Sequence, residues 1–229
     1  ILHLSFYAIC GDIDGIVESS GICAPKGLAG ILFALLRVPE LALGEYQQKI
    51  RCSLHHLVQQ SADSSIDVWD SELPFRWCEG GSGIIPTLLE ASQLFSDDQY
   101  QALAKKGADG IWENGIMRCG SSLYSGTFGN VYALLQVYAF TGDTKYLAQA
   151  YQLTLSHCDG RISVVTLRLP KELHMDKDSI DSRDFDSLNL LDGRLGEACL
   201  FLDIQQPFHA SFPGCYNDVA STTSLMPID

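Results

Sequence analysis

Three features are scarce or absent in this chain of 229 residues, and each absence excludes a class of protein. Basic residues are few: 15 Lys and Arg stand against 28 Asp and Glu, for a formal net charge of −13. Nucleic acids and anionic membranes are disfavoured as partners, because both attract basic surfaces. No two cysteines have the C-x-x-C spacing, which excludes a zinc ribbon. No apolar run is long enough to span a bilayer without Gly, Pro or charge interrupting it.

What remains is typical of a globular protein, with 46% apolar and 19% charged residues. We expect a single domain over residues 1–229, because this length builds one substantial core. The eight cysteines are scattered through apolar segments and no signal peptide is recognised, so we expect buried, reduced thiols and a cytoplasmic location. The chain begins with Ile1 rather than Met, from which we expect a fragment of a longer product.

A glycine turn of the form G-x-x-G occurs four times, each time directly before an apolar segment. The turns begin at Gly27, Gly80, Gly126 and Gly193, at intervals of 53, 46 and 67 residues. Self-similarity at intervals of this size indicates a repeat protein. Glycine also lets backbone N–H groups approach a ligand, and a following helix favours anions at its start. We therefore expect the four turns to lie at one end of the helices, around a shared pocket.

The segments between the turns predict pairs of helices. Apolar helices are expected at about 28–37, 83–95 and 129–140. Each is followed by an amphipathic partner: the first at 45–60, the second from 97–98 towards Trp112, and the third from Asp143 onwards. Such hairpins predict an all-α fold with an inner, sandwiched layer and an outer, half-solvated layer. The longest interval holds extra chain, which we interpret as a surface insertion over residues 159–190. The tail from Gln205 to Asp229 has little helical character.

Two stretches resemble the motifs of a known family. Residues 77–83, Trp-Cys-Glu-Gly-Gly-Ser-Gly, resemble the Trp-Cys-His-Gly-Ala-Pro-Gly motif of the lanthionine synthetase C-like (LanC-like) family. Residues 122–135 resemble its Gly-Leu-Cys-His-Gly-x-x-Gly-Asn-x-Tyr-x-x-Leu stretch, and the turns at Gly27 and Gly193 fall where neighbouring repeats would lie. The resemblance covers about residues 24–215. It implies an α/α toroid of seven helical hairpins, of which this chain supplies about the last four as an incomplete, open ring. The exposed edge of such a ring would favour self-association.

The resemblance also implies a zinc ion that activates a thiol, of a peptide cysteine or of glutathione, for addition to dehydroamino acids in a peptide. Cys78 matches the first of its three ligands. Tyr124 and Ser125 stand where the other two, a Cys and a His, would be, so the zinc site is degenerate. Glu79 replaces the His after the first Cys, and Lys26 replaces the His that precedes the first turn. A compensating set with Cys78, Glu79, Cys119 and a histidine is an alternative.

Other residues near the motif have both functional and structural interpretations. Arg76 would clamp a carboxylate such as that of glutathione, or else cap a helix or pair with Glu72. Trp77 would line the pocket, pack the hairpins, or do both. Lys26 and Glu79 are the candidates for catalytic roles, and Glu79 is equally interpretable as structural.

Three hypotheses follow. The first is a LanC-like binding or scaffold protein without zinc, whose partner would be glutathione or a dehydroamino-acid peptide. The second is an active thiol-adding enzyme with a rearranged metal site or none. The third is a carbohydrate-active toroid with paired carboxylates such as Glu79 and Asp192, which would have to face each other across one pocket.

Overall fold

The computed structural model describes residues 9–10, 12–19, 21–25, 27–63, 76–78, 80–114, 120–158 and 188–213. Within these residues the fold is all-helical and contains no strand, as the sequence predicts. The elements are α2 (Ile13–Ser19), α3 (Leu28–Leu36), α4 (Pro39–Ala42), α5 (Gln47–Asp63), the 3-10 turn η1 (Gly81–Gly83), α6 (Ile85–Phe95), α7 (Asp98–Asn114), α8 (Thr127–Thr141), α9 (Thr144–Cys158) and α10 (Arg194–Asp203).

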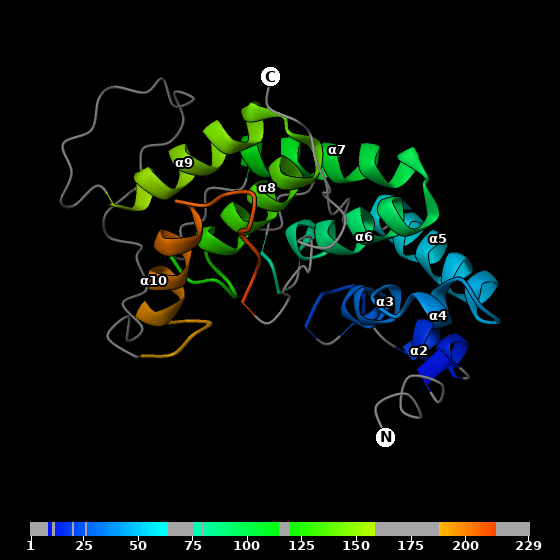
Figure 1. Ribbon diagram of the computed structural model, residues 1–229. Helices are drawn as coiled ribbons and strands as arrows, with labels where there is room; N and C mark the ends of the chain where they lie inside the picture. The colour runs from blue at the N-terminus through cyan, green and yellow to red at the C-terminus, as the bar shows by residue number, and fades with distance from the viewer. Residues whose placement is uncertain are drawn as a thin grey trace, which may run out of the picture.

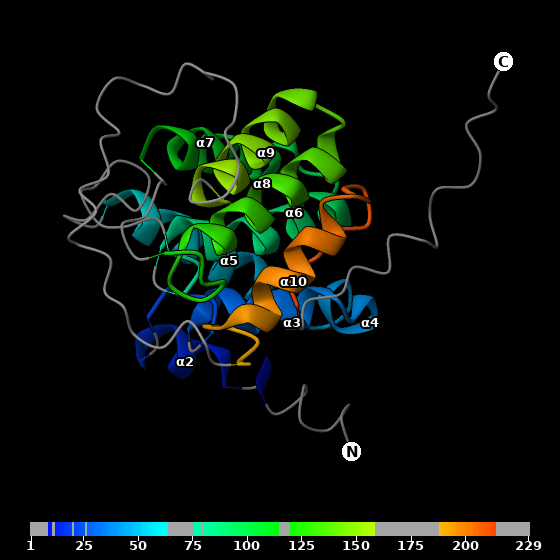
Figure 2. The same cartoon turned by 90° about the vertical axis from the view of Figure 1, so that its left-hand side faces the viewer.

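The helices form an arch of hairpins, which is part of an α/α toroid (Figures 1 and 2). The inner layer runs in the order α3, α6, α8 and α10, each packed against the next. The outer helices α5, α7 and α9 each pack on the inner helix that precedes them, and α2 packs on α5. Figure 1 shows α3 and α10 at the two ends of the arch. The described residues therefore hold three hairpins and the inner helix of a fourth, which agrees with an incomplete ring.

The burial pattern confirms the two layers. All of α8 from Thr127 to Tyr138 is buried, because an inner helix has neighbours on both sides. The outer helix α7 buries a single stripe that contains Ala104, Ala108 and Ile111. Residues spaced in this way share one face of a helix, so α7 contributes that face to the core and leaves the opposite one to solvent.

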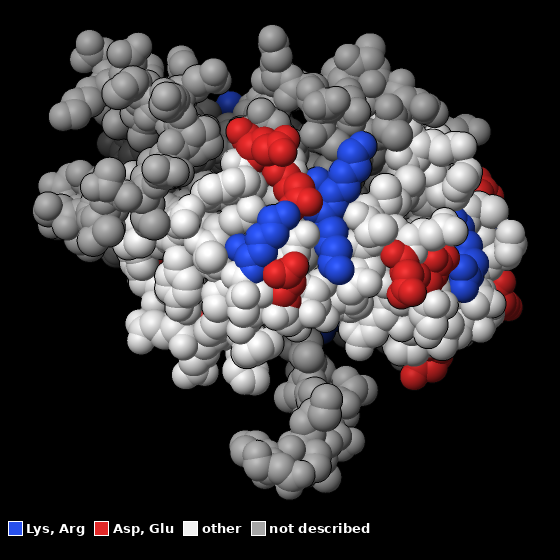
Figure 3. Space-filling model, turned by 90° about the horizontal axis from the view of Figure 1, so that it is seen from above, with Lys and Arg blue, Asp and Glu red and all other residues white. Residues whose placement is uncertain are grey.

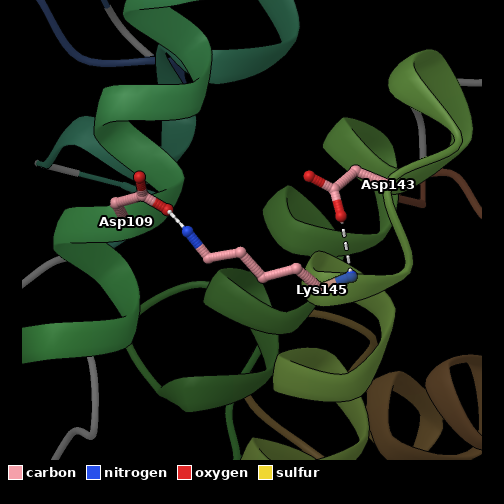
Figure 4. A network of polar contacts seen from close by, with 3 residues as sticks. All are labelled: Asp109, Asp143 and Lys145. Atoms are coloured by element: carbon pink, nitrogen blue, oxygen red, sulfur yellow. Dashed lines mark hydrogen bonds and ion pairs between the residues drawn. The ribbon is translucent and has the colours of Figure 1, made fainter.

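Aspartates begin two outer helices. The backbone N–H of Gln99 donates to Asp97 Oδ1 at 3.0 Å, so Asp97 caps the start of α7. At the start of α9 the N–H of Lys145 donates to Asp143 Oδ1 at 2.9 Å, while the Lys145 ammonium binds Asp109 Oδ1 on α7 at 2.6 Å (Figure 4). These contacts tie the two outer helices together. Figure 3, which views the molecule from above, shows acidic and basic side chains interspersed on that face.

Some expectations need correction or fall on residues that are not described. The α5 helix continues to Asp63, past the expected end near residue 60. Five cysteines whose side chains are described carry free thiols; Cys10 and Cys78 are buried, Cys23 and Cys199 are half-buried, and Cys52 is exposed. Of the expected insertion over 159–190, only residues 188–190 are described. Among the described residues, no helix has the length and apolar character that a membrane crossing requires.

Candidate binding site at the glycine turns

The first glycine of each turn is the N-cap of an inner helix, or of η1 before α6, in one repeated conformation. Gly27, Gly80, Gly126 and Gly193 have φ of −125°, −121°, −109° and −137°, with ψ between −170° and −172°. The second glycine of each turn is required because backbone atoms lie close to it, and not because of its dihedral angles. A Cβ on Gly30, Gly83, Gly129 or Gly196 would lie 1.9, 2.2, 2.3 or 2.3 Å from the carbonyl oxygen six residues earlier. A side chain there would displace the backbone.

Successive turns interlock through those same glycines. A Cβ on Gly83 would lie 2.8 Å from the Cβ of Ala24, which belongs to the preceding turn. The same relation joins Gly129 to Trp77 Cβ at 2.9 Å and Gly196 to Leu123 Cγ at 2.8 Å. Ala24, Trp77 and Leu123 each stand three residues before the first glycine of their turns. The four turns therefore lie side by side at one end of the inner layer, which confirms the predicted placement of the turns.

A ladder of backbone hydrogen bonds crosses three of the turns. The N–H of Cys78 donates to the carbonyl of Tyr124 at 3.1 Å, and the N–H of Tyr124 donates to the carbonyl of Leu191 at 3.1 Å. All three residues stand two places before the first glycine of their turns. The equivalent residue of the first turn is Pro25, which has no N–H to donate. The ladder places the backbones of Cys78 and Tyr124, two positions singled out by the sequence, next to each other.

The Ser122 hydroxyl holds the Tyr124–Ser125 segment in place. Its Oγ accepts the N–H groups of Tyr124 and Ser125, both at 3.1 Å, and donates to Asp192 Oδ1 at 2.6 Å. Ser122 is buried, whereas its partner Asp192 is exposed. Asp192, which the carbohydrate hypothesis pairs with Glu79, is thus engaged with Ser122, and Glu79 lies outside the described residues.

Trp77 lies between two aromatic side chains. Its ring stacks on Phe212, with ring centroids 4.0 Å apart and planes within 5°, and Tyr124 lies 6.3 Å away at a tilt. Phe212 is buried and meets Tyr132 edge-on at 5.7 Å. Sequence reasoning missed Phe212, because the tail lacks periodicity. Its position as an aromatic residue directly before Pro213 was the signal that could have found it.

A cavity of about 780 Å³ opens beside the first two turns. Its walls are mostly apolar and come from α3, from the start of α6, and from Pro25 and Trp77. Among its described lining residues Arg37 carries a charge. Burial raises the pKa of the nearby Glu90 carboxyl, and Arg37 opposes that shift. The pocket predicted for all four turns is therefore found beside two of them, and its shape and lining suit a largely apolar ligand.

The remaining candidates divide into described and undescribed residues. The carbonyl of Arg76 accepts the N–H of Gly80 at 2.7 Å, and this bond closes the second turn. The Arg76 side chain is half-buried. Lys26, Glu79, Glu72 and Cys119 lie outside the described residues. The expected roles of Lys26 and Glu79, and an Arg76–Glu72 pair, therefore stay predictions.

The donors that the structure describes at the glycine turns do not fit a zinc ion. The three positions that the resemblance assigns to zinc ligands hold one thiol, on the buried Cys78, and two hydroxyls, on Tyr124 and Ser125. Among the described residues, no three His, Cys, Asp or Glu side chains are grouped so that they could hold a metal. Neutral hydroxyls are poor ligands for zinc, which is bound by thiolate, imidazole and carboxylate.

Hairpins arranged as an α/α toroid, with interlocked glycine turns at one end, define the class of protein. The sequence pattern of the family described as lanthionine synthetase C-like protein matches residues 25–216, and the chain belongs to this family. LanC-like protein GCL1 of Arabidopsis thaliana is 29% identical over 198 residues, and Glutathione S-transferase LANCL1 of Danio rerio is 28% identical over 198 residues. Each match covers 83% of this chain but 42% and 44% of the two relatives, so the chain spans less than half their length.

Proposed function

We propose that this chain is a LanC-like member without a zinc site, which acts by binding a ligand at its glycine turns or as a scaffold rather than by catalysis. One observation carries the proposal. The Cys78–Tyr124 backbone bond, at 3.1 Å, brings together the positions from which the family's ligands come, and only one of the three carries a zinc-binding group. In this proposal the turns keep the arrangement that the resemblance implies, without the donors that would hold the metal.

The ligand proposed is glutathione or a peptide that carries dehydroamino acids. The name of the Danio rerio relative supports glutathione. Arg76 would bind a carboxylate of the ligand, and the apolar cavity beside Trp77 would take up its less polar part. A location in the cytoplasm, where glutathione is abundant and thiols stay reduced, fits this proposal.

The alternative is an active zinc-dependent thiol-adding enzyme of the glutathione or lanthionine type. Lys26 and Glu79 would then serve as acid or base, because both stand in the turns where the family has histidines. The name Glutathione S-transferase LANCL1 favours this alternative as a property of that relative. The two functions differ in whether the purified chain holds a zinc ion to which a thiol substrate can bind.

Metal content separates the two functions. We expect the purified chain to hold no zinc after dialysis against a mild chelator. Tyr124→Cys combined with Ser125→His should gain about one zinc per chain, because three ligands with Cys78 leave one position open. Each single substitution should gain little, and adding Cys78→Ala to the double variant should abolish the gain. Stoichiometric zinc in the unsubstituted chain, or none in the double variant, would contradict the proposal.

A further inference from the structure

The inner helices carry a polar residue at one equivalent position. Ten residues after the first glycine of each turn stand Arg37, Glu90, Gln136 and Asp203, and the residue directly before is leucine in all four repeats. Asp203 Oδ2 accepts the Tyr132 hydroxyl at 2.7 Å. Burial raises the pKa of the Glu90 carboxyl and Arg37 lowers it, so these two residues lie near each other. Gln136 differs, because its Nε2 is buried and has no hydrogen-bond partner among the described residues.

The Gln136 side chain, which is 4% exposed, lines a groove of about 60 Å³ between α6 and α8. A buried amide donor without a partner costs stability, and such groups are rare in native proteins. An unpaired donor in the wall of a groove therefore indicates a ligand. The walls of the groove include the polar side chains of Glu90, Gln93 and Gln136 and the apolar ones of Leu89, Ala139 and Phe140.

The groove lies inside the arch and not at either of its ends. Both helices that form it have an inner helix on each side, because α6 packs on α3 and α8, and α8 packs on α6 and α10. Pro86 lines both the groove and the 780 Å³ cavity, so the two share part of a wall. A bound water needs about 10–15 Å³. The groove therefore has room for a group of a few heavy atoms.

The polar groups of the groove select the chemistry of the ligand. The Gln136 amide has a donor end and an acceptor end, and a half-turn of its terminal torsion exchanges them, whereas the Glu90 carboxylate only accepts. A ligand ammonium would leave the Gln136 donor unpaired, and a ligand carboxylate would face the charge of Glu90. A primary carboxamide has one carbonyl oxygen and two N–H groups, which match one donor and two acceptors.

We propose that this groove binds a primary carboxamide. Gln136 donates to its carbonyl oxygen and accepts one of its N–H groups, and Glu90 accepts the other. The apolar walls at Leu89 and Phe140 contact the carbon atoms next to the amide. Neither Glu90 nor Gln136 belongs to a glycine turn, so the inference does not rest on the proposed function and holds whether or not the chain binds zinc.

Titration of the isotope-labelled chain with acetamide, followed by NMR, tests the proposal. The side-chain amide signal of Gln136, identified by its loss in Gln136→Met, should shift and reach saturation. The backbone N–H signal of Ala139 in the groove wall should do the same. N,N-dimethylacetamide keeps the carbonyl but has no N–H, acetate carries a negative charge, and methylammonium has no acceptor. None of these three probes should give a saturating shift.

Substitutions locate the binding site. Glu90→Met should weaken acetamide binding about tenfold, because a hydrogen bond to a charged group is lost. Gln136→Met should abolish saturation at Ala139, yet melt at no lower temperature, because it removes a buried donor without a partner. Gln136→Leu replaces it if it does not fold. Gln149→Met is the matched control, since Gln149 is 7% exposed, lies on α9 and does not line the groove. It should bind acetamide as the unsubstituted chain does.

Two peptides, Ala-Gln-Ala and Ala-Glu-Ala, distinguish the source of the carboxamide when their ends are blocked without a primary amide. Tighter binding of the glutamine peptide than of acetamide would assign the groove to a peptide side chain, and binding of acetamide alone would assign it to a free amide. Three results would overturn the proposal. They are no saturation with acetamide, which leaves the groove to water, saturation with methylammonium or N,N-dimethylacetamide, and unchanged acetamide affinity in Gln136→Met.

Discussion

The Cβ of Trp77 lies so close to Gly129 that no side chain would fit at position 129. A Cβ built on Gly129 would stand 2.9 Å from it and 2.3 Å from the carbonyl oxygen of Leu123. The first neighbour belongs to the preceding turn and the second to the glycine's own turn. Because Gly129 has no side chain, its turn can close as it does and the two repeats can lie this close together.

Gly129→Ala should therefore destabilise the fold by about 2–3 kcal/mol, because neither the backbone carbonyl nor Trp77 can give way cheaply. The free energy of unfolding, obtained from denaturant titration, measures the effect. Gly21→Ala is the matched control, since a Cβ on Gly21 meets no atom within 4 Å. We expect it to change stability by less than about 0.5 kcal/mol. Equal losses in the two variants would refute the interlocking of turns.

Phe212→Ala should expose Trp77 and shift its fluorescence emission to longer wavelength, because the stacked ring 4.0 Å away is removed. The measurement uses a background with Trp69→Phe and Trp112→Phe, so that Trp77 alone emits. A loss of about 3 kcal/mol in stability should accompany the shift, as for other buried Phe→Ala changes. Phe208→Ala is the control, since Phe208 is 54% exposed and lies against Tyr138. An unchanged Trp77 spectrum in Phe212→Ala would show that the stack does not form in solution.

Stability should fall at high pH through Tyr146. Burial, followed by the nearby carboxylates of Asp109 and Asp143, raises the pKa of Tyr146 to about 12 from its ordinary value of 10. The folded state keeps the phenol proton where the unfolded chain has lost it, so this contribution is complete below pH 10 and disappears as the pH approaches 12. Tyr146→Phe should show a smaller fall in unfolding free energy over that window. The difference between the variants at pH 7 provides the reference, and parallel curves up to pH 12 would contradict the assignment.

Much of the fold was predictable because the glycine turn and its apolar helix recur four times. An apolar segment after each glycine turn predicted the inner helices, and Asp97 and Asp143 predicted where two outer helices begin. Boundaries were less certain where propensity is weak. The inner helix expected from residue 83 begins at Ile85, because Gly81–Gly83 forms a 3-10 turn instead.

The candidate site was only half predictable. The motifs alone were enough to single out Cys78, Tyr124 and Ser125, because each stands at a fixed distance from a glycine. The Ser122–Asp192 hydrogen bond and the Trp77–Phe212 stack join residues 70 and 135 positions apart, and no local pattern encodes such pairs.

Pro25 makes the first junction between turns different from the later ones. Between the second, third and fourth turns the backbones are tied by amide protons, at Cys78 and at Tyr124. At the equivalent place in the first turn the proline ring leaves no proton to share, and the first junction relies on the Thr87–Ala29 bond and on the contact of Ala24 with Gly83. The later turns are thus linked by backbone hydrogen bonds, whereas the first junction is held by a side-chain hydrogen bond and by packing. The cavity thus lies at the junction whose turns Pro25 cannot join by the backbone bond that links the later turns.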